Sequence, residues 1–509
     1  MISANEKRVA KNTLFLYARM LLVMLVSIYT SRVILQTLGA SDYGIYNVVA
    51  GIVTMMSFLN GALSVASTRF ITFALGKNDK EEQNRTFSAS LNIHLTVSIV
   101  IFFIAEIVGL WFLYNKLVIP PDRFDAAFWV LQFSIITTCI TFTQVPYRAS
   151  LIAHENMAIY AYIGLYEAFS KLAIAYLIYV SPIDRLIFYS ALILLNTIIV
   201  QIVYRYYTYR KYDECRFRLF YDKKLYKKLV SYGGWDLFGG VAVACQGQGI
   251  NILLNMFFGP VVNAARAIAF QIQSAVAVFV DNFLMAVRPQ VVKACAEENY
   301  EQMYKLTFKA AKLSYMLMFA LMCPICFEIN TILHLWLGEN VPDYTAVFTV
   351  FVLITYMLMS IDTSCMMAFH AIGKIAFGNV VGGTMMISAL PISYILLRNG
   401  CPPYTVFIVI FCINMLMQVL DWNIVHYHVP FKWQTLFKDV ILPCIYVTII
   451  GCVVPALLTV YLDEGVPRLI LVVILTEIVN IVSYWHIALT EEERAAIGDF
   501  IRKKINHTR

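Results

Sequence analysis

Long hydrophobic runs alternate with short polar breaks along the whole chain. Each run approaches the roughly 20 residues that a helix needs to cross the hydrocarbon core of a membrane. Their continuous length differs from the short alternating segments of a transmembrane β-barrel. The pattern therefore predicts an all-α polytopic membrane protein with about fourteen transmembrane helices. The predicted helices lie near Thr13–Leu35, Gly44–Ala66, Phe87–Tyr114, Ala126–Tyr147, Ala158–Val180, Leu186–Tyr206, Leu229–Phe257, Asn263–Val287, Lys312–Trp336, Tyr344–His370, Ala376–Leu397, Tyr404–His426, Val440–Leu462 and Leu469–Leu489.

Composition supports this interpretation. Of the 509 residues, 60% are hydrophobic and 14% are charged, whereas a soluble protein has about 25% charged residues. A chain with so few charges needs a surface that faces lipid. The polar breaks are too short to fold into a catalytic or nucleotide-binding domain, and the sequence has no GxxxxGK[ST] loop. It is therefore not an ATP-driven pump by itself.

Charge distribution predicts the orientation. When the N-terminus is placed in the cytoplasm and fourteen crossings alternate, most of the 39 Lys and Arg residues fall on the cytoplasmic side, as the positive-inside rule requires. Both termini are then cytoplasmic. We attribute the net charge of +7 to topology and not to nucleic-acid binding, although the basic loop Tyr209–Lys228 could also contact anionic lipid headgroups. Met1–Asn12 lacks the cleavage site of a removable signal peptide.

A weak internal repeat suggests two halves. Phe58–Ala89 and Phe279–Ala310 share residues at equivalent positions, each in a helix, a charged loop and the next helix. We therefore predict an N-terminal lobe with its cytoplasmic linker at residues 1–228 and a C-terminal lobe at 229–428. Residues 429–509 add two helices and a basic tail. Transporters with parallel repeats place the substrate path between the halves.

Charged side chains within the predicted helices are candidates for transport, because burial of a charge in hydrocarbon requires a partner or a wet cavity. Arginine suits phosphate recognition, since its planar guanidinium donates two parallel hydrogen bonds. Side chains near helix ends could instead extend to headgroups, which is an equal alternative for Arg32 and Arg69. The candidate substrate-binding cations are Arg19, Arg32, Arg69, Lys171 and Arg266.

Intramembrane acids admit two roles. They could bind a coupling Na⁺ or H⁺, or they could pair with the cations and hold helices together. The candidate ion-coupling residues are Glu106, Asp236, Asp281 and Asp362. Glu167 and Lys171 are four residues apart, a spacing that favours a structural pair on one helix face. We expect no metal site at Cys323 and Cys326, because no second pair of ligands lies nearby.

The predicted seventh helix is unusually polar and rich in glycine. Such a helix cannot face lipid on all sides, and it could line a cavity or act as a hinge. Close helix packing through small residues is the alternative. The candidate cavity or hinge residues are Gly239, Gly240, Gln246, Gln248, Asn251 and Asn255.

Three stretches carry a family resemblance: SRVILQTLGASDYGIYNVVAGI, PYRASLIAHENM and MMAFHAIGKIAFGNVVGG. The chain resembles the polysaccharide-exporter branch of the multidrug/oligosaccharidyl-lipid/polysaccharide superfamily, which contains the Wzx-type flippases of bacterial surface-glycan pathways. The resemblance covers essentially the whole chain. Its most specific part is LGxxDYGIY, from Leu38 to Tyr46, which is a family signature and reveals no chemistry.

The resemblance implies two six-helix MATE-like lobes plus two C-terminal helices, with a cationic cavity that opens alternately to each side of the bacterial inner membrane. The implied cargo is an undecaprenyl-diphosphate-linked oligosaccharide for O-antigen, capsule or another polysaccharide, moved to the outer leaflet and coupled to a Na⁺ or H⁺ gradient. The implied partners are membrane lipids and glycan polymerase machinery, and we expect a monomer without metal or organic cofactor. The arginines at 19 and 266 occupy helices compatible with the cavity.

Other functions remain open at this stage. A peptidoglycan-precursor lipid flippase and a MATE-like drug or cation antiporter share the architecture, although several intramembrane arginines suit an anionic cargo better. A membrane glycan polymerase or glycosyltransferase is disfavoured, because the outer loops are short and the sequence has no DxD motif. We therefore expect a transporter and not an enzyme.

Overall fold

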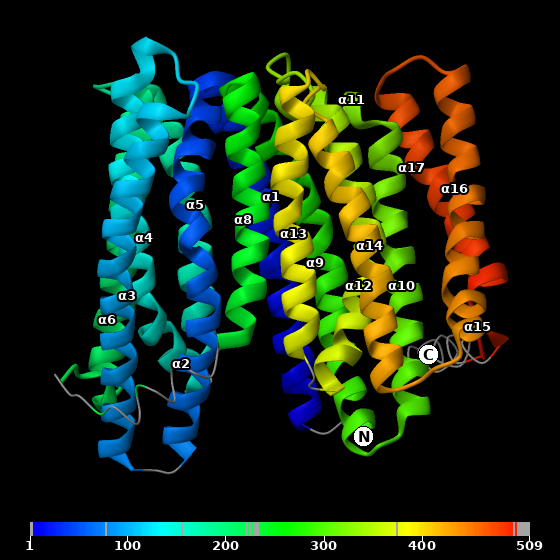
Figure 1. Cartoon of the computed structure of the whole chain (residues 1–509), viewed down its shortest axis with the longest axis horizontal. Coiled ribbons are helices and arrows are strands. Elements are labelled where there is room, and N and C mark those ends of the chain that lie inside the picture. Colours follow the sequence, from blue (N-terminus) through cyan, green and yellow to red (C-terminus); the bar gives the residue numbers. More distant parts are fainter. Residues whose placement is uncertain are drawn as a thin grey trace. The chain divides into compact units, whose positions relative to one another are not determined.

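The structure is a computed structural model that describes residues 4–76, 79–154, 156–218, 222, 226, 234–372, 375–491 and 494–495. These residues form helices and no strands (Figure 1). Thirteen helical segments of the described chain are long and apolar enough to cross a membrane, and one of them covers both pieces of a bent helix. The prediction of an all-α protein with fourteen long helices is confirmed.

The chain divides into two compact units, and unit 1 comprises Met1–Ala267, Glu339–Tyr344 and Asn379–Val406. Its helices are α1 (Ala4–Thr54), α2 (Phe58–Gly76), α3 (Lys80–Asn115), α4 (Phe124–Ala153), α5 (Met157–Leu177), α6 (Arg185–Lys211), α8 (Gly234–Phe258), the first part of α9 (Pro260–Ala296) and most of α13 (Ile375–Arg398). The N-terminal lobe that we predicted ends at residue 228, whereas this unit includes α8 and segments from much later in the chain.

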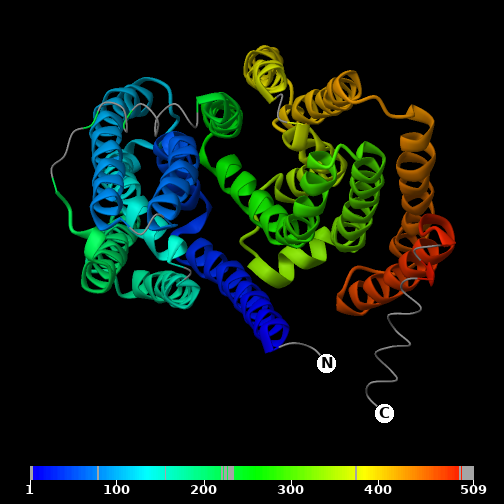
Figure 2. The ribbon, with the colours of Figure 1, turned by 90° about the horizontal axis from the view of Figure 1, so that it is seen from below.

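Unit 2 comprises Ile268–Gly338, Thr345–Gly378 and Phe407–Arg509. It contains the rest of α9 and the C-terminal helices: α10 (Tyr300–Phe327), α11 (Ile329–Leu337), α12 (Thr345–Ile372), α14 (Thr405–His428), α15 (Trp433–Leu436), α16 (Leu442–Tyr461) and α17 (Val466–Ser483). Figure 2 shows the ribbon after a quarter turn, in which most helices of each unit are seen nearly end on.

Packing within each unit follows the apolar faces of the helices. In unit 1, α4 packs against α2, α3 and α6, and α1 packs against α5 and α8. In unit 2, α10 packs against α12, α16 and α17. One face of α3 is apolar and exposed. It carries Ile99, Phe103 and Ile107 at four-residue intervals. Exposed apolar side chains in that pattern face lipid, so the protein is a multi-pass membrane protein.

Side-chain caps fix several helix starts. Asp79 accepts hydrogen bonds from the amides of Glu81 and Glu82 at the start of α3. Asp184 caps α6 in the same way, and Asn299 caps α10. A carboxylate or amide oxygen at this position satisfies amides that have no partner within the helix.

A buried ion pair links two helix starts in unit 2. The guanidinium of Arg468, in the first turn of α17, donates two hydrogen bonds to the carboxylate of Glu328 beside α11, at 2.7 and 3.1 Å. The two residues expose 7% and 1% of their surface. This geometry satisfies both charges at once, which an ion pair in a region of low polarity requires.

Candidate functional sites

The signature Leu38–Tyr46 has a structural explanation, residue by residue. Gly39 divides α1 into two helical pieces, and its φ of 80° is a conformation that other residues rarely adopt. The boundary between the first two predicted helices therefore lies at this glycine. Gly44 faces Pro260 so closely that a Cβ would overlap the proline carbonyl. The ring of Tyr46 packs edge-on against Tyr189, with centroids 4.8 Å apart.

Asp42, also in the signature, belongs to an ion cluster that joins α1, α4 and α6. Arg123 reaches the carboxylates of both Asp42 and Asp184 at 2.5 Å. Burial would raise the pKa of the Asp184 carboxyl, but the hydrogen bonds from Arg123 outweigh burial and lower that pKa below its ordinary value. The cluster is only partly exposed, and it joins the segment of α1 that follows Gly39 to the starts of α4 and α6.

The polar residues of α8 form a seam within unit 1. Asn251 donates to the carbonyl oxygen of Asn47 in α1 at 3.2 Å. It also accepts a hydrogen bond from Asn263 in α9 at 2.8 Å. Asn255 is fully buried, and its side-chain oxygen accepts a hydrogen bond from the backbone amide of Val118 at 2.8 Å. The amides that we predicted to line a cavity or form a hinge are therefore hydrogen-bonded to neighbouring elements of the same unit.

The remaining candidates in α8 also contact their own unit. Gln246 donates to the carbonyl oxygen of Met386 in α13 at 3.3 Å. Gln248 lies against Gly51, where a Cβ would come within 2.6 Å of its side-chain oxygen. Gly239 and Gly240 are partly buried, and a Cβ at Gly239 would lie 3.9 Å from Asn379.

Arg266 lies beside this seam. Its guanidinium donates to the carbonyl oxygen of Gly247 at 2.7 Å, so α9 contacts α8 through a charged side chain within a membrane span. The side chain is partly buried.

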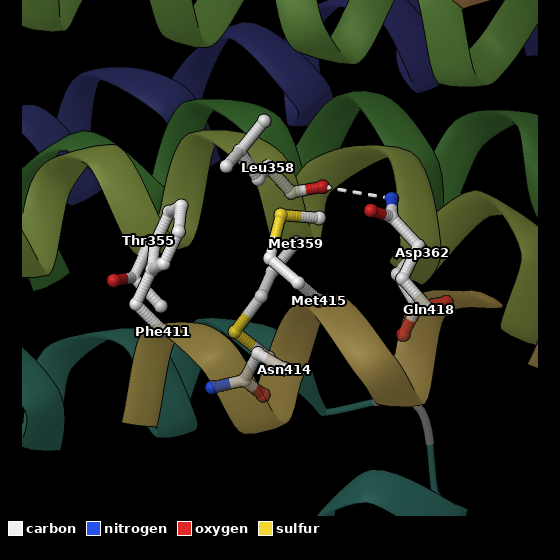
Figure 3. A pocket seen from close by; sticks show the side chains of 8 residues that line it. All are labelled: Thr355, Leu358, Met359, Asp362, Phe411, Asn414, Met415 and Gln418. Carbon is white, nitrogen blue, oxygen red and sulfur yellow. Dashed lines mark hydrogen bonds between the residues drawn. The ribbon is translucent and has the colours of Figure 1, made fainter. Parts of the chain in front are cut away.

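Unit 2 contains a cavity that is lined by side chains of α12 and α14, four of them polar (Figure 3). The eight lining residues are Thr355, Leu358, Met359, Asp362, Phe411, Asn414, Met415 and Gln418. Gln418 donates to the backbone carbonyl oxygen of Leu358 at 3.1 Å, which leaves its side-chain oxygen available. One carboxylate oxygen of Asp362 is buried and has no hydrogen-bond partner within the part of the chain that the structure describes.

A second aspartate accompanies Asp362. Asp421 exposes 7% of its surface, lies one turn beyond Gln418 on α14, and is close enough to interact electrostatically with Asp362. No Lys, Arg or His of the described chain forms an ion pair with either carboxylate. Two adjacent carboxylates without a cation in a membrane span are most stable when a proton or a small cation neutralises one of them.

The other predicted residues are not gathered at one place. Glu106 accepts a hydrogen bond from Gln132 at 3.1 Å, and Asp281 is exposed and accepts one from Tyr356 at 3.0 Å. Lys171 is exposed, and no ion pair joins it to Glu167 in the described part of the chain. Arg32 lies on α1 and is partly exposed.

The side chains of Arg19, Arg69 and Asp236 lie outside the described residues. The cationic patch predicted from Arg19 together with Arg266 therefore stays a prediction. In the chain as described, no three His, Cys, Asp or Glu side chains are close enough to hold a metal ion.

Sequence reasoning missed three members of the unit 2 site: Asn414, Gln418 and Asp421. Their spacing of four and then three residues places them on one face of α14. That spacing was visible in the sequence, within a run that is otherwise strongly apolar. The partner of Glu328 was missed as well, because Arg468 lies at a helix start, where a cation usually extends to headgroups.

The fold defines the class of this protein: it is an all-α, multi-pass membrane protein with the fold of MATE and MurJ transporters. The chain belongs to the polysaccharide biosynthesis protein family, whose model matches residues 9–295. This match confirms the resemblance that LGxxDYGIY carries. No curated protein matches the chain at a significant level.

Two solved structures illustrate the fold. An inward-facing multidrug resistance MATE family transporter of the MOP superfamily superimposes with a TM-score of 0.66 at 14% identity, over 79% of this chain and 94% of the transporter. The lipid II flippase MurJ in an inward closed conformation gives a TM-score of 0.66 at 13% identity, over 92% of this chain and 98% of the flippase. MurJ thus matches a larger share of the present chain.

Proposed function

We propose that this protein is a flippase that moves an undecaprenyl-diphosphate-linked oligosaccharide from the cytoplasmic to the outer leaflet of the bacterial inner membrane. The observation that carries the proposal is the family match, which joins polysaccharide biosynthesis to a chain with a transporter fold. Transport of the repeat unit is the step of surface-glycan synthesis that such a fold can supply. Alternating access exposes the polar headgroup to each side in turn while the polyprenyl chain stays in lipid.

Asp362 and Asp421 are the proposed coupling site in unit 2. A cation gradient can drive a conformational cycle when the ion binds one state more tightly than the other. The two carboxylates offer hard oxygen ligands for Na⁺ or a pair of acids for H⁺. Asn414 and Gln418 line the same cavity as Asp362. Among the predicted coupling acids whose side chains the structure describes, Glu106, Asp281 and Asp362, only Asp362 lines a cavity and has a buried oxygen without a hydrogen-bond partner.

Arg266 is the proposed diphosphate contact in unit 1. A guanidinium within a span binds phosphate through charge-assisted hydrogen bonds, and its bond to Gly247 holds it on α8. Arg32, on the partly exposed side of α1, is proposed as a second cation for the same cargo.

Complementation with chemical analysis tests the proposal. A strain that lacks this gene should lose surface glycan and accumulate the lipid-linked repeat unit, which mass spectrometry of extracted lipids identifies. The intact chain should restore glycan display. If deletion instead depletes cross-linked peptidoglycan and accumulates its lipid precursor, the peptidoglycan-precursor flippase is the correct function.

The same strains test the remaining alternatives. Loss of drug resistance with normal glycan would identify an antiporter. Loss of glycan together with a shortened or incomplete lipid-linked intermediate would identify an enzyme of assembly and not a flippase. The proposed orientation, with both termini in the cytoplasm, is tested by reporter fusions at each terminus, and the proposed monomeric state by mass measurement of the purified protein.

A further inference from the structure

The membrane-exposed stripe of α6 leads directly into a group of aromatic and basic residues. Leu195, Ile199, Ile202, Tyr206 and Tyr209 are all exposed, at spacings of four, three, four and three residues. Such spacing keeps them on one face of the helix. At a rise of 1.5 Å per residue, the whole stripe is about 21 Å long and its apolar part, Leu195–Ile202, is about 11 Å long, so the apolar part can contact the upper half of an acyl chain. Its last two positions are tyrosines at the end of the predicted span Arg185–Lys211.

Two guanidinium groups lie over these tyrosine rings. The guanidinium carbon of Arg210 lies 4.9 Å from the ring centroid of Tyr206, and that of Arg216 lies 5.7 Å from the ring centroid of Tyr209. Cation–π contacts of this kind orient the cation without neutralising it. Arg216 also forms an exposed ion pair with Asp213 at 3.1 Å. We call Tyr206, Tyr209, Arg210 and Arg216 the headgroup patch.

The loop that carries Arg216 is fixed by side chains from two other helices and their connections. Asn84 at the start of α3 donates to the carbonyl oxygens of Glu214 and Arg216, at 2.9 and 2.6 Å. His154, after α4, contacts the carboxylate of Glu214 at 2.5 Å and stacks on the ring of Tyr212 with centroids 3.8 Å apart. A loop that only supplied positive charge for membrane topology would not need these contacts. They hold Arg216 at a defined position in unit 1.

We propose that the α6 stripe and the headgroup patch bind one anionic phospholipid molecule. Its acyl chain would lie along Leu195–Ile202, its phosphate between Arg210 and Arg216, and its glycerol region against the two tyrosines. The stripe favours a lipid over an acidic protein segment, because its exposed apolar side chains lead from the membrane span into the patch. This lipid is a bound regulator or structural ligand and is distinct from the transported cargo.

Native mass spectrometry of the purified, delipidated full chain tests the proposal. Phosphatidylglycerol should be retained in preference to phosphatidylcholine by about tenfold, since each surface cation adds to the attraction of an anionic headgroup. The double variant R210Q/R216Q should lose most of this preference. The matched control R85Q/K293Q removes the same charge from two exposed cations outside the headgroup patch, each paired with a glutamate one helical turn away, and it should keep the preference.

Four outcomes would overturn the proposal, three of which compare variants or lipids and one of which concerns the wild-type protein alone. The first is an unchanged preference in R210Q/R216Q, and the second is an equal loss in the control. The third is displacement of phosphatidylglycerol by an equal concentration of undecaprenyl diphosphate, which would show that the patch takes the carrier lipid instead. Thermal unfolding checks that each variant is folded. If R210Q/R216Q does not fold, Y206L/Y209L replaces it, and wild-type protein that shows no preference refutes the proposal without any variant.

Discussion

Unit 1 and unit 2 both contain polar side chains within membrane spans, but the two sets differ in their hydrogen-bond partners. In the seam of α8, Asn251 and Asn255 have protein partners on neighbouring elements. In the unit 2 cavity, one oxygen of Asp362 has no partner among the described residues, and a second carboxylate lies nearby. Amides that are hydrogen-bonded to neighbouring helices hold those helices together, whereas an ionisable group without a partner in a membrane span is a candidate for binding an ion. The comparison therefore indicates that the α8 amides have a structural role, whereas the unit 2 carboxylates are candidates for ion binding.

The largest effect should come from removing the acidic pair. Asp362→Asn and Asp421→Asn should each reduce transport to less than about a tenth, because an amide cannot take up a coupling ion by changing its charge. The amount of folded protein should stay unchanged or rise. Glycan display in the complemented strain measures transport, and immunoblotting measures the protein.

Asp281→Asn is the matched control for that experiment. Asp281 is exposed and is already bonded to Tyr356, so its replacement should leave transport near the wild-type level. If both Asp362→Asn and Asp421→Asn still transport normally, these two carboxylates are not the coupling site.

Two neighbouring glycines test the close packing of α8. A Cβ at Gly249 would come within 2.5 Å of the Leu390 side chain, whereas a Cβ at Gly247 would meet no atom within 4 Å. Gly249→Ala should therefore cost about 1–2 kcal/mol of stability through overpacking. Gly247→Ala should be neutral or slightly stabilising, because alanine favours a helix. Thermal unfolding in detergent measures both, and equal unfolding temperatures would contradict the packing of α8 against α13.

Removal of an amide from the seam should have a smaller effect. Asn251→Ala deletes hydrogen bonds to α1 and α9, which should cost about 1 kcal/mol. Transport should fall only as far as the amount of folded protein falls. A loss of transport in fully folded Asn251→Ala protein would instead assign this amide to the cargo path, as we first predicted from the sequence.

The smallest effect should come from Tyr356→Phe. This change removes the hydroxyl that donates to the exposed Asp281, and an exposed hydrogen bond of this kind contributes less than about 0.5 kcal/mol. The unfolding temperature should therefore match that of the wild type within error. A clear decrease would show that Asp281 is structurally important, and it would then be a poor control for Asp362.

The sequence was sufficient to predict the fold class, the number of long helices and the family, because the length of each hydrophobic run and the stretch Leu38–Tyr46 are local signals. It could not reveal what that stretch does. The partner of Asp42 is Arg123, which is 81 residues away, and Gly44 is required by Pro260, which is still more distant. These pairings arise only when helices pack.

The candidate site shows the same limit. Asp362 was predicted from its charge alone, but charge did not separate it from Glu106 or Asp281, which have hydrogen-bond donors of their own. Only the contacts of α12 with α14 give Asp362 a cavity and a neighbouring acid. Periodicity along α14 was the available signal, since Asn414, Gln418 and Asp421 lie on one helix face.

The pair of Arg468 with Glu328 has a consequence for biogenesis. Glu328 is synthesised 140 residues before Arg468, so the acid is made before its counterion. Both charges are satisfied only when α17 lies beside α11, because an ion pair in a region of low polarity needs both partners. We therefore expect α17 to reach its final position last, after the helices around Glu328 have been inserted.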